Sequence, residues 1–393
     1  MNTYERSRFQ EERALLISFP EKLRKTLERL VNSLKTKENV YGIGLFGSWS
    51  RGEAETSSDV DLFILDKSNI SRKYVERVVA GGFLVDLDYV PKTWLEGPIP
   101  PEIDQKLYEM QVLYDRDWSL ANTKLLVARV YGSAERVDIR TEVHVIDSDV
   151  YLSRATSALA REDFRSAQLF AVMALESILK VPAEVALLPF SNSHFVERLE
   201  ASLAKVGFSE LFKEYLEISS LGKADKSLVK EKLELFKAVW HEINFATNQS
   251  SQAFASAHFV IRKRLSYYLN PAFLQGALSR AGALADSGKA WETSHYLKAI
   301  LVDIVEGYVW LKALTGRSRL DYARLMHALE RLERKNPKNY ENIVEFLDLG
   351  DVNKANVEKT VVRVRETILR VRRERKVLIK NHIIGDGNVI SRT

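Results

Sequence analysis

Two short motifs between residues 44 and 65 carry side chains suited to binding phosphate and metal ions. Gly47-Ser48 follows an apolar run, and Asp59-Val60-Asp61 comes after the ten residues 49–58. A glycine lets phosphate approach the backbone, while N–H groups at the start of a helical turn and the Ser48 hydroxyl suit phosphate oxygens. Side chains alternate along a strand, so Asp59 and Asp61 share a face. Two neighbouring carboxylates repel each other unless a cation lies between them.

A second acidic pair, Asp86 and Asp88, interrupts the apolar run 83–90 and also shares a face. An acid buried alone in a strand costs several kcal/mol, so at least one of the two needs a partner such as a metal ion. Two Mg²⁺ ions held by such carboxylates bind a triphosphate, activate a hydroxyl and neutralise the leaving pyrophosphate. The four acids therefore point to phosphoryl or nucleotidyl transfer with Mg²⁺, or Mn²⁺ in its place.

Local patterns predict the elements that position these residues. Leucines at helical spacing predict a helix over 23–34. Short apolar runs at 41–46, 60–65 and 83–90 predict three strands, with a fourth at 111–114. Between the second and third strands we expect a helix containing Tyr74, Val75, Val78 and Val79, ended by Gly81-Gly82. The expected fold is an α+β N-terminal domain with a mixed sheet, followed by all-α bundle units.

These motifs resemble the polymerase β-type nucleotidyltransferase superfamily. The superfamily pattern is Gly-Ser, about ten residues, Asp-x-Asp, and a later Asp on the next core strand. The compact minimal branch is similar in more detail, through Leu45-Phe46-Gly47-Ser48, Arg51-Gly52, Ser58-Asp59-Val60-Asp61-Leu62 and Val85-Asp86-Leu87. The chain departs from that pattern at Ser50, where alanine is common, and has a bulky Trp49 beside it.

The resemblance implies a role for each matching residue. Asp59 and Asp61 would bind both metal ions, and Asp86 would bind the catalytic one and help to deprotonate the acceptor hydroxyl. Asp88 is the alternative third acid, but Asp86 falls in the Val-Asp-Leu position of the pattern. The nucleoside triphosphate would be held by Gly47 and Ser48, with help from Arg51, Ser57 and Ser58.

The rest of the chain, from about residue 119, is almost purely helical in pattern. Residues 136–146 alternate and predict an exposed strand or an extended linker. Two stretches that both begin Leu-Ser-Arg-Ala, at Leu152 and Leu278, suggest a repeated helical unit. We expect a catalytic domain at 1–118, a connector at 119–150, and helical units at 151–270 and 271–393. The two units look like HEPN-type or kanamycin-nucleotidyltransferase-type helical domains.

The C-terminal segment is rich in Arg and Lys, and an Arg375 to His382 spacing loosely matches HEPN ribonucleases. Such a basic run can grip nucleic acid phosphates. An apolar stripe at helical spacing runs through the same segment, however: Val361, Val364, Ile368, Val371 and Leu378. The stripe favours a packed helix whose arginines face solvent. His241, His295 and His327 lie in helical segments and are expected to pack or face solvent rather than bind metal.

Composition sets outer bounds on function. The 393 residues are 46% hydrophobic and 28% charged, which is typical of a globular chain. No cysteine and seven scattered histidines leave oxygen ligands for any metal. The start has no signal-peptide layout, and we see no apolar run of about 20 residues, so we expect a cytoplasmic protein without a membrane segment.

The sequence says least about the acceptor, the molecule that would receive the nucleotide. A net charge of +5 permits a polyanionic partner without requiring one. We favour a small-molecule hydroxyl acceptor, with transfer to a protein or RNA as the alternative and a non-catalytic nucleotide-binding module as a third hypothesis. Helical units of this kind commonly pair, which points to a homodimer.

Overall fold

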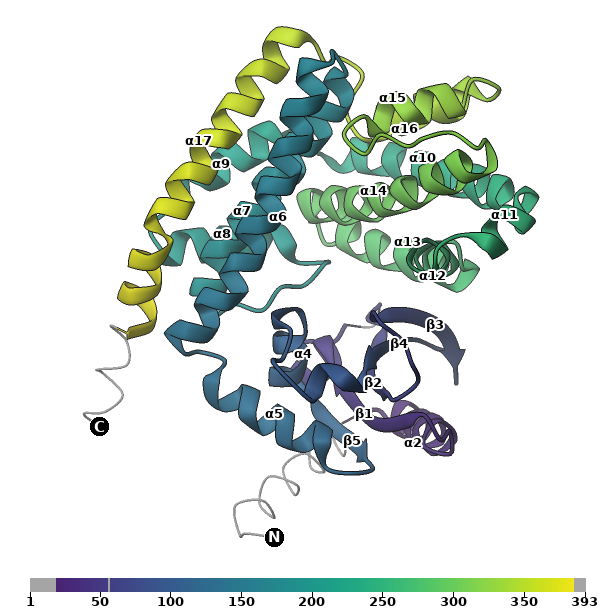
Figure 1. Ribbon diagram of the computed structural model, residues 1–393, viewed down its shortest axis with the longest axis vertical. Helices are drawn as coiled ribbons and strands as arrows, with labels where there is room; N and C mark the ends of the chain where they lie inside the picture. The colour runs from purple at the N-terminus through teal and green to yellow at the C-terminus, as the bar shows by residue number, and fades with distance from the viewer. Residues whose placement is uncertain (1–18, 56, 385–393) are drawn as a thin grey trace. The chain divides into compact units, whose positions relative to one another are not determined.

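A computed structural model describes residues 19–55 and 57–384 of the chain (Figure 1). The chain divides into two compact units, each described by itself below. The first comprises Met1–Tyr131 and Asn270–Gly276, and the second comprises Gly132–Leu269 and Ala277–Thr393. The first is a mixed sheet with helices and the second is all helical, so the expected fold class is confirmed.

The first unit is built around a five-stranded sheet of order β3-β4-β2-β1-β5. Strands β2 and β4 are parallel, and every other pairing is antiparallel. The elements in chain order are α2 (Glu21–Leu34), β1 (Val40–Phe46), α3 (Gly47–Arg51), β2 (Val60–Asp66), β3 (Tyr74–Ala80), β4 (Phe83–Pro91), η1 (Lys92–Leu95), η2 (Pro101–Ile103), α4 (Asp104–Glu109), β5 (Gln111–Asp115) and α5 (Ser119–Val130).

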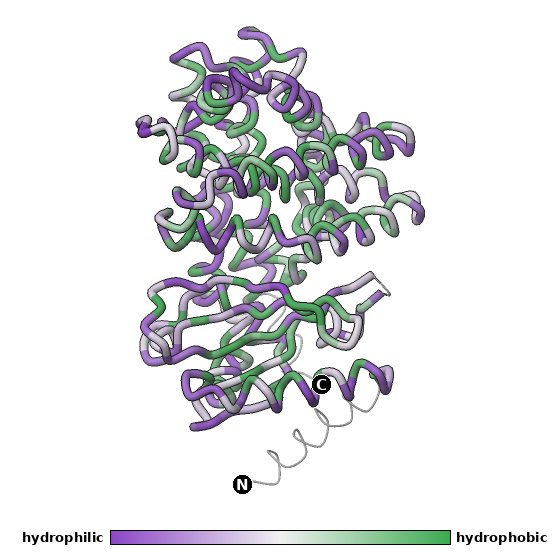
Figure 2. The backbone as a smooth tube through the Cα atoms, turned by 90° about the vertical axis from the view of Figure 1, so that its right-hand side faces the viewer, coloured by the Kyte–Doolittle hydropathy of each residue, from purple (hydrophilic) through white to green (hydrophobic). Residues whose placement is uncertain are grey.

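Each face of this sheet carries its own hydrophobic core. On one face, alternate residues of β1, β2 and β4 pack with Leu23 and Leu27 of α2. On the other, Phe63 and Leu65 of β2 pack with residues of α4 and α5. Both faces of β2 are therefore buried, which explains its nearly continuous apolar sequence. The central strands appear as largely green stretches in Figure 2. By alternation, Asp61 shares the α4 face with Phe63 and Leu65.

The helix predicted around residues 74–79 is wrong, because these residues form strand β3. Strand β3 pairs antiparallel with β4, and Ala80 is the partner of Phe83. Gly81 and Gly82, with φ of 56° and 86°, make the two-residue turn between them. Positive φ at both turn positions matches the twist of a hairpin, and glycine adopts it without strain. The β-branched Val75, Val78 and Val79 favour a strand once this turn supplies a pairing partner.

The second unit consists of helices in the part of the chain that the structure describes: α6 (Ala134–Ala160), α7 (Phe164–Val185), α8 (Phe195–Lys205), α9 (Ser209–Ile218), η3 (Leu221–Lys223), α10 (Lys226–Gln249), α11 (Ser251–Ser256), α12 (Phe259–Tyr268), most of α13 (Pro271–Asp286), α14 (Ala290–Thr315), α15 (Leu325–Leu332), α16 (Pro337–Phe346), α17 (Lys354–Ile379) and η4 (Lys380–Ile384). Helix α7 is long and apolar enough to cross a membrane, but 72% of its most apolar window is buried inside the protein. Its apolar sequence is explained by its place in the core.

The strand or linker predicted at 136–146 is wrong, because these residues lie inside α6. Val137, Thr141 and Val145 are buried at intervals of one helical turn, while Ile139 is exposed. The alternating pattern was coincidental, since a helix and a strand share positions four residues apart.

The helix order of the second unit repeats. Helices α6 to α10 are followed, after α11 and α12, by α13 to α17 with the same succession of long and short helices. The loops at 186–194 and 316–324 are equal in length. Positive φ also recurs at matching places: Leu187 and Arg317 each lie two residues beyond their helix, as do Ser220 and Asp348. The two series of helices therefore match in order, in loop length and in the positions of these turns.

Each half of the repeat also binds the start of a helix in the other half. Glu292, in the first turn of α14, accepts the N–H groups of Val196 (3.1 Å) and Glu197 (2.6 Å) at the start of α8. At the start of α7, Ser166 accepts the N–H of Met326, and Asp163 accepts that of His327, at the start of α15. These reciprocal bonds satisfy helix donors that have no partner within their own helix.

The reciprocal bonds explain why the two halves form one compact unit. The first compact unit runs to Tyr131, beyond the predicted end of the catalytic domain at residue 118, and most of the predicted units 151–270 and 271–393 lies in the second compact unit. The division into two evolutionary units stays a prediction.

Replacing Glu292 tests the reciprocal bonds. Glu292→Ala leaves two buried N–H groups of α8 without an acceptor and should lower the free energy of unfolding by about 2 kcal/mol. Glu292→Gln retains one acceptor oxygen and should cost less. Chemical denaturation measures both, with Glu200→Ala on the exposed face of α8 as the control. Equal stability of Glu292→Ala and the control would contradict this account of the interface.

Candidate active site

The register of the sheet places three charged residues in one row across β3, β4 and β2. Asp61 is the parallel partner of Asp86, and Asp86 is the antiparallel partner of Arg77. Asp59 lies just before β2 begins. The two acids that sequence spacing selected on separate strands therefore stand side by side on the α4 face of the sheet.

Gly47 directly follows Phe46, the β1 register partner of Asp61, and lies against the Asp61 side chain. It begins α3 directly after the strand, as predicted, with φ of +77°. A Cβ at this position would lie 2.4 Å from Oδ2 of Asp61, closer than van der Waals contact permits. Only glycine therefore combines this backbone conformation with contact against the Asp61 carboxylate.

Arg77 neutralises two of the acids. Its Nε and Nη2 donate to the two oxygens of Asp86, each at 2.6 Å, and Nη2 also donates to Asp59. The Arg77 residue is only 7% exposed, so the guanidinium is a buried positive charge held by a bidentate pair. Carboxylates converging on one cation show that this position favours positive charge.

A different carboxylate engages the predicted phosphate-binding residues. Glu109, at the end of α4, accepts the N–H of Gly47 at 2.9 Å through Oε1 and a guanidinium N–H of Arg51 at 2.7 Å through Oε2. Burial opposes the charge on Arg51, but Glu109, with Glu53, outweighs it and raises the Arg51 pKa. Ser50 also donates its hydroxyl to the Glu109 carbonyl oxygen.

Asp88 lies apart from the row. It is 2% exposed and forms an ion pair with Lys106 of α4. Its register partners are Phe63 on β2, two residues after Asp61, and Val75 on β3, two residues before Arg77. Its Oδ1 accepts no hydrogen bond from the described residues. The lysine already satisfies the need for a countercharge that we inferred from its burial.

The remaining predicted contacts lie around the same edge of the sheet. Ser48 is in the first turn of α3. Ser57 and Ser58 lie in the loop that leads to β2, and the Ser58 hydroxyl accepts the N–H of Glu55 at 2.9 Å. These placements agree with a role near a nucleotide, which stays a prediction.

The carboxylates of Asp59, Asp61 and Asp86 are suitable ligands for a hard cation, but Arg77 already binds two of them. Within residues 19–55 and 57–384, no three acidic or histidine side chains form a ready metal cage. Asp59, Asp61 and Asp86 supply the carboxylate oxygens that Mg²⁺ prefers. Arg77 now donates to oxygens of Asp59 and Asp86, so a cation that binds both acids would compete with its guanidinium.

Sequence reasoning missed Arg77 and Glu109. A usable signal existed for Arg77, because a Gly81-Gly82 turn that pairs Ala80 with Phe83 also pairs residue 77 with residue 86. No local signal marks Glu109, which reaches Gly47 from 62 positions along the chain.

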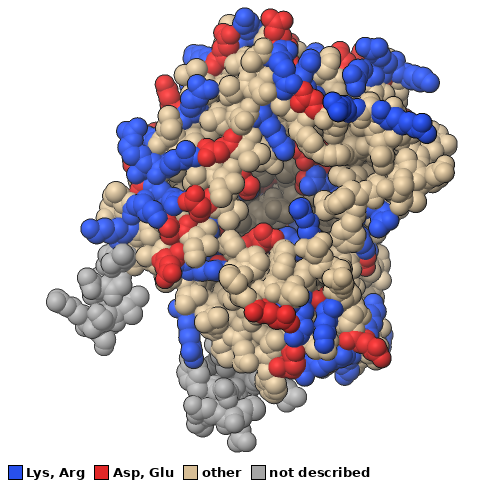
Figure 3. Space-filling model, in the orientation of Figure 1, with Lys and Arg blue, Asp and Glu red and all other residues tan. Residues whose placement is uncertain are grey.

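The predicted basic surface is largely internally paired. Along α17, Arg363, Arg370, Arg372 and Arg375 form ion pairs with acids of α6 and α9. The apolar stripe of this helix is buried. Basic and acidic side chains lie side by side along this edge of the helical unit (Figure 3). Arg375, the proposed nuclease residue, is 8% exposed and paired with Glu142 and Asp138.

A mixed sheet that presents Gly-Ser and three acids at one edge defines the nucleotidyltransferase class of catalytic domain. The family model described as "Nucleotidyltransferase domain" matches residues 27–113 of the chain. No curated protein matches the chain. Among solved structures, a nucleotidyltransferase-like protein from Exiguobacterium sibiricum 255-15 matches with 10% identity and a TM-score of 0.31, covering 82% of this chain and 90% of that one.

Removing Arg77 tests whether it occupies a cation position. Arg77→Met should lower the free energy of unfolding by about 3 kcal/mol, because it leaves two carboxylates without their countercharge. Mg²⁺ should restore more stability to this variant than it adds to the wild type. Denaturant unfolding with and without Mg²⁺ measures both effects. The exposed Arg72→Met is the control; an equal Mg²⁺ effect in Arg77→Met and the wild type would contradict the assignment.

Proposed function

We propose that this protein is a Mg²⁺-dependent nucleotidyltransferase that moves a nucleoside monophosphate from a nucleoside triphosphate to a hydroxyl group. The row of Asp86 and Asp61 across paired strands, with Gly47 against Asp61, carries the proposal. The family match over residues 27–113 supports the same reaction class.

The acids would hold the metal and the acceptor. Asp59, Asp61 and Asp86 would bind the magnesium ions, which supply positive charge to the triphosphate and ease deprotonation of the acceptor hydroxyl. A carboxylate oxygen of Asp86 would take that proton. The acceptor oxygen would then form a bond to the α-phosphorus. At the same time the bond between the α-phosphorus and the oxygen that bridges it to the β-phosphate would break, and pyrophosphate would leave.

Two groups of internal hydrogen bonds, those of Arg77 and those of Glu109, would exchange when substrate binds. Arg77 gives up Asp59 and Asp86, and Glu109 gives up the Gly47 N–H and Arg51. A phosphate then replaces one carboxylate, Glu109, at the same two donors. Since an anion already binds there, the donors are oriented for phosphate before substrate arrives.

We favour a small-molecule acceptor and a cytoplasmic location. The pairing of the α17 arginines with acids of α6 and α9 leaves little of their charge for an RNA backbone. A helical unit fused to the catalytic domain also reduces the need for a separate protein partner.

Assays with ATP, CTP, GTP and UTP and Mg²⁺ test the reaction. Pyrophosphate release should require an acceptor from a panel of small hydroxyl compounds, with RNA and purified protein as separate arms. Nucleotide binding without pyrophosphate release in every arm would overturn the proposal in favour of a binding module.

Substitutions by asparagine distinguish the three acids proposed to act in catalysis from Asp88. Asp59→Asn, Asp61→Asn and Asp86→Asn should each reduce transfer by about a thousandfold, corresponding to about 4 kcal/mol of transition-state stabilisation. Asp88→Asn should retain most activity, because Asp88 pairs with Lys106 rather than standing in the row. Initial rates of pyrophosphate release measure this. Loss of activity only in Asp88→Asn would reverse the choice of third acid.

Alanine substitutions at Gly47 and Gly52 test the close approach of the Gly47 backbone to the Asp61 carboxylate. Gly47→Ala should abolish transfer, because its Cβ displaces the Asp61 carboxylate. Gly52→Ala is a matched control, since Gly52 also has positive φ (+72°) but an added Cβ meets nothing within 4 Å. It should lose about 1 kcal/mol of stability and keep its activity. Equal rates in the two variants would refute the importance of the Asp61 contact.

A further inference from the structure

A short segment of the first unit, residues 270–276, lies far along the chain from the sheet that it contacts. It comprises Asn270 and the start of α13, and it groups with the sheet rather than with the helical unit. Three of its residues, Asn270, Phe273 and Gly276, lie against Arg77 of β3. The segment therefore reaches the residue that neutralises two of the candidate metal ligands.

Asn270 fixes the backbone of Arg77. Strand β3 is an edge of the sheet, and an edge strand has backbone groups without a strand partner. The Asn270 side-chain amide donates to the Arg77 carbonyl oxygen at 3.2 Å. The side-chain oxygen of Asn270 accepts the N–H of Ala272 at 2.9 Å, and its main-chain oxygen accepts that of Phe273 at 2.8 Å. One residue thus both begins α13 and ties it to β3.

Phe273 and Gly276 enclose the guanidinium of Arg77. The centre of the buried Phe273 ring lies 5.0 Å from Cζ of Arg77. An aromatic face attracts a cation, and the attraction is stronger when both groups are removed from water. A Cβ at Gly276 would lie 2.8 Å from Nη1 of Arg77 and 2.6 Å from Cδ1 of Leu84. The absence of a side chain at Gly276 therefore makes room for the guanidinium.

The guanidinium makes the ring contact and its ion pairs from a single position. Its Nε and Nη2 donate to Asp86, and Nη2 also donates to Asp59. A guanidinium that leaves these carboxylates therefore also leaves the face of the Phe273 ring. Any interaction that holds Arg77 in this position makes it a stronger competitor for the two acids.

The charges in the row still favour a metal ion. In their ionised form Asp59, Asp61 and Asp86 carry three negative charges, against the single positive charge of Arg77. A divalent cation adds the two charges that balance them. The affinity for that cation then depends on how firmly Arg77 holds its two carboxylates, and segment 270–276 supplies part of that hold.

We propose that segment 270–276 lowers the metal affinity of the catalytic domain by holding Arg77 on its two carboxylates, a role that rests on the metal site of the proposed function. Phe273 and Gly276 are then positioning residues, which act on the metal ion through Arg77. They lie outside the matched residues 27–113. Loosening their contacts with the guanidinium therefore tightens metal binding.

Manganese binding measures this effect without nucleotide or turnover. Mn²⁺ stands in for Mg²⁺, and electron paramagnetic resonance gives the free Mn²⁺ during a titration of the full chain. Phe273→Leu removes the aromatic face but keeps an apolar side chain, and it should bind Mn²⁺ about fivefold more tightly than the wild type. Phe273→Tyr retains an aromatic face and should bind Mn²⁺ as the wild type does. Equal affinity of Phe273→Leu and the wild type would overturn the proposal.

Two glycines of α13 provide a matched pair. Gly276→Ala places a Cβ against Nη1 of Arg77 and should also tighten Mn²⁺ binding. Gly282→Ala adds the same methyl group where it meets nothing within 4 Å, and it should leave Mn²⁺ affinity unchanged. The same shift in both variants would point to the helix rather than to the guanidinium and would count against the proposal.

A double-mutant cycle shows whether the effect passes through Arg77. The guanidinium is absent in Arg77→Met, so adding Phe273→Leu to this variant should no longer change Mn²⁺ affinity. Circular dichroism checks that each variant is folded. Undiminished tightening in the Arg77→Met background would mean that Phe273 acts by another route, and the proposal would then be wrong.

Failure of the proposed reaction has a different signature. Mn²⁺ binding that responds to Phe273→Leu, together with no pyrophosphate release from any nucleotide, would support the role of segment 270–276 and reject the transferase. Asp61→Asn lacks one proposed ligand and should lose the Mn²⁺ binding, which locates the ion. Absence of Mn²⁺ binding in both the wild type and Arg77→Met would reject the metal site and, with it, the role of the segment.

Discussion

The ion pairs of Arg77 allow three carboxylates to gather at one edge of the sheet. Asp59 and Asp86 both bind its guanidinium, and Asp61 stands next in the row. Without a positive charge between them, neighbouring buried carboxylates would take up protons or separate. Arg77 lies on β3, which is an edge strand paired only with β4. Segment 270–276 of the same unit holds this residue in place, because Asn270 donates to the Arg77 carbonyl oxygen and the guanidinium lies 5.0 Å from the centre of the Phe273 ring.

Glu109 complements Arg77 with the opposite charge. It occupies the Gly47 N–H and Arg51, the donors that the family pattern assigns to phosphate. The resting site thus keeps an internal cation where metal is expected and an internal anion where phosphate is expected. In the proposed reaction, a nucleotide that arrives with its metal would replace both charges, whereas either one alone would leave an internal charge without its partner. On this proposal the arrangement would favour joint binding of nucleotide and metal, because each displaced group would leave a buried countercharge for the other component to satisfy.

The sequence predicted those parts of the site whose signals are local. Gly47, Asp59, Asp61 and Asp86 follow from spacing and from apolar runs, and the register places Asp61 beside Asp86. Arg77 was missed because residues 74–79 also fit a helix, and only the glycine turn identifies the hairpin. Glu109 was missed because tertiary folding alone brings α4 against β1. In the helical unit, periodicity predicted helices from 152 onward but misread α6, in which a chance alternation coincided with a buried stripe.

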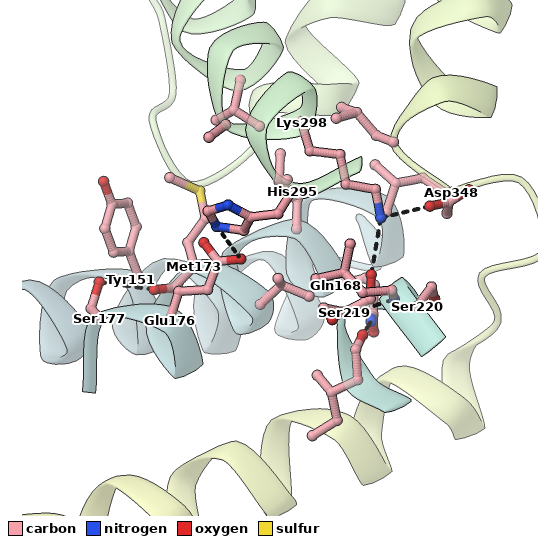
Figure 4. Close-up of a pocket in the computed structure, with 18 of the residues that line it drawn as sticks. Tyr151, Gln168, Met173, Glu176, Ser177, Ser219, Ser220, His295, Lys298 and Asp348 are labelled. Atoms are coloured by element: carbon pink, nitrogen blue, oxygen red, sulfur yellow. Dashed lines mark hydrogen bonds and ion pairs between the residues drawn. The ribbon is translucent and has the colours of Figure 1, made fainter. Parts of the chain in front are cut away.

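The repeated halves of the helical unit have the same order of helices, but they differ at positions of α7 and α14 that line a cavity in this unit (Figure 4). Counted from the first residue of each helix, His295 of α14 corresponds to Leu169 of α7, and Lys298 corresponds to Val172. In the opposite sense, Glu176 of α7 corresponds to Val302 of α14. Packing alone would be satisfied by apolar residues at all these places, as each has one in the other half. Polar groups on only one member of each pair, including an imidazole nitrogen that no described residue satisfies, are a cost to folding that packing does not explain. The two halves therefore differ at these positions while their turns, capping bonds and helix order remain alike.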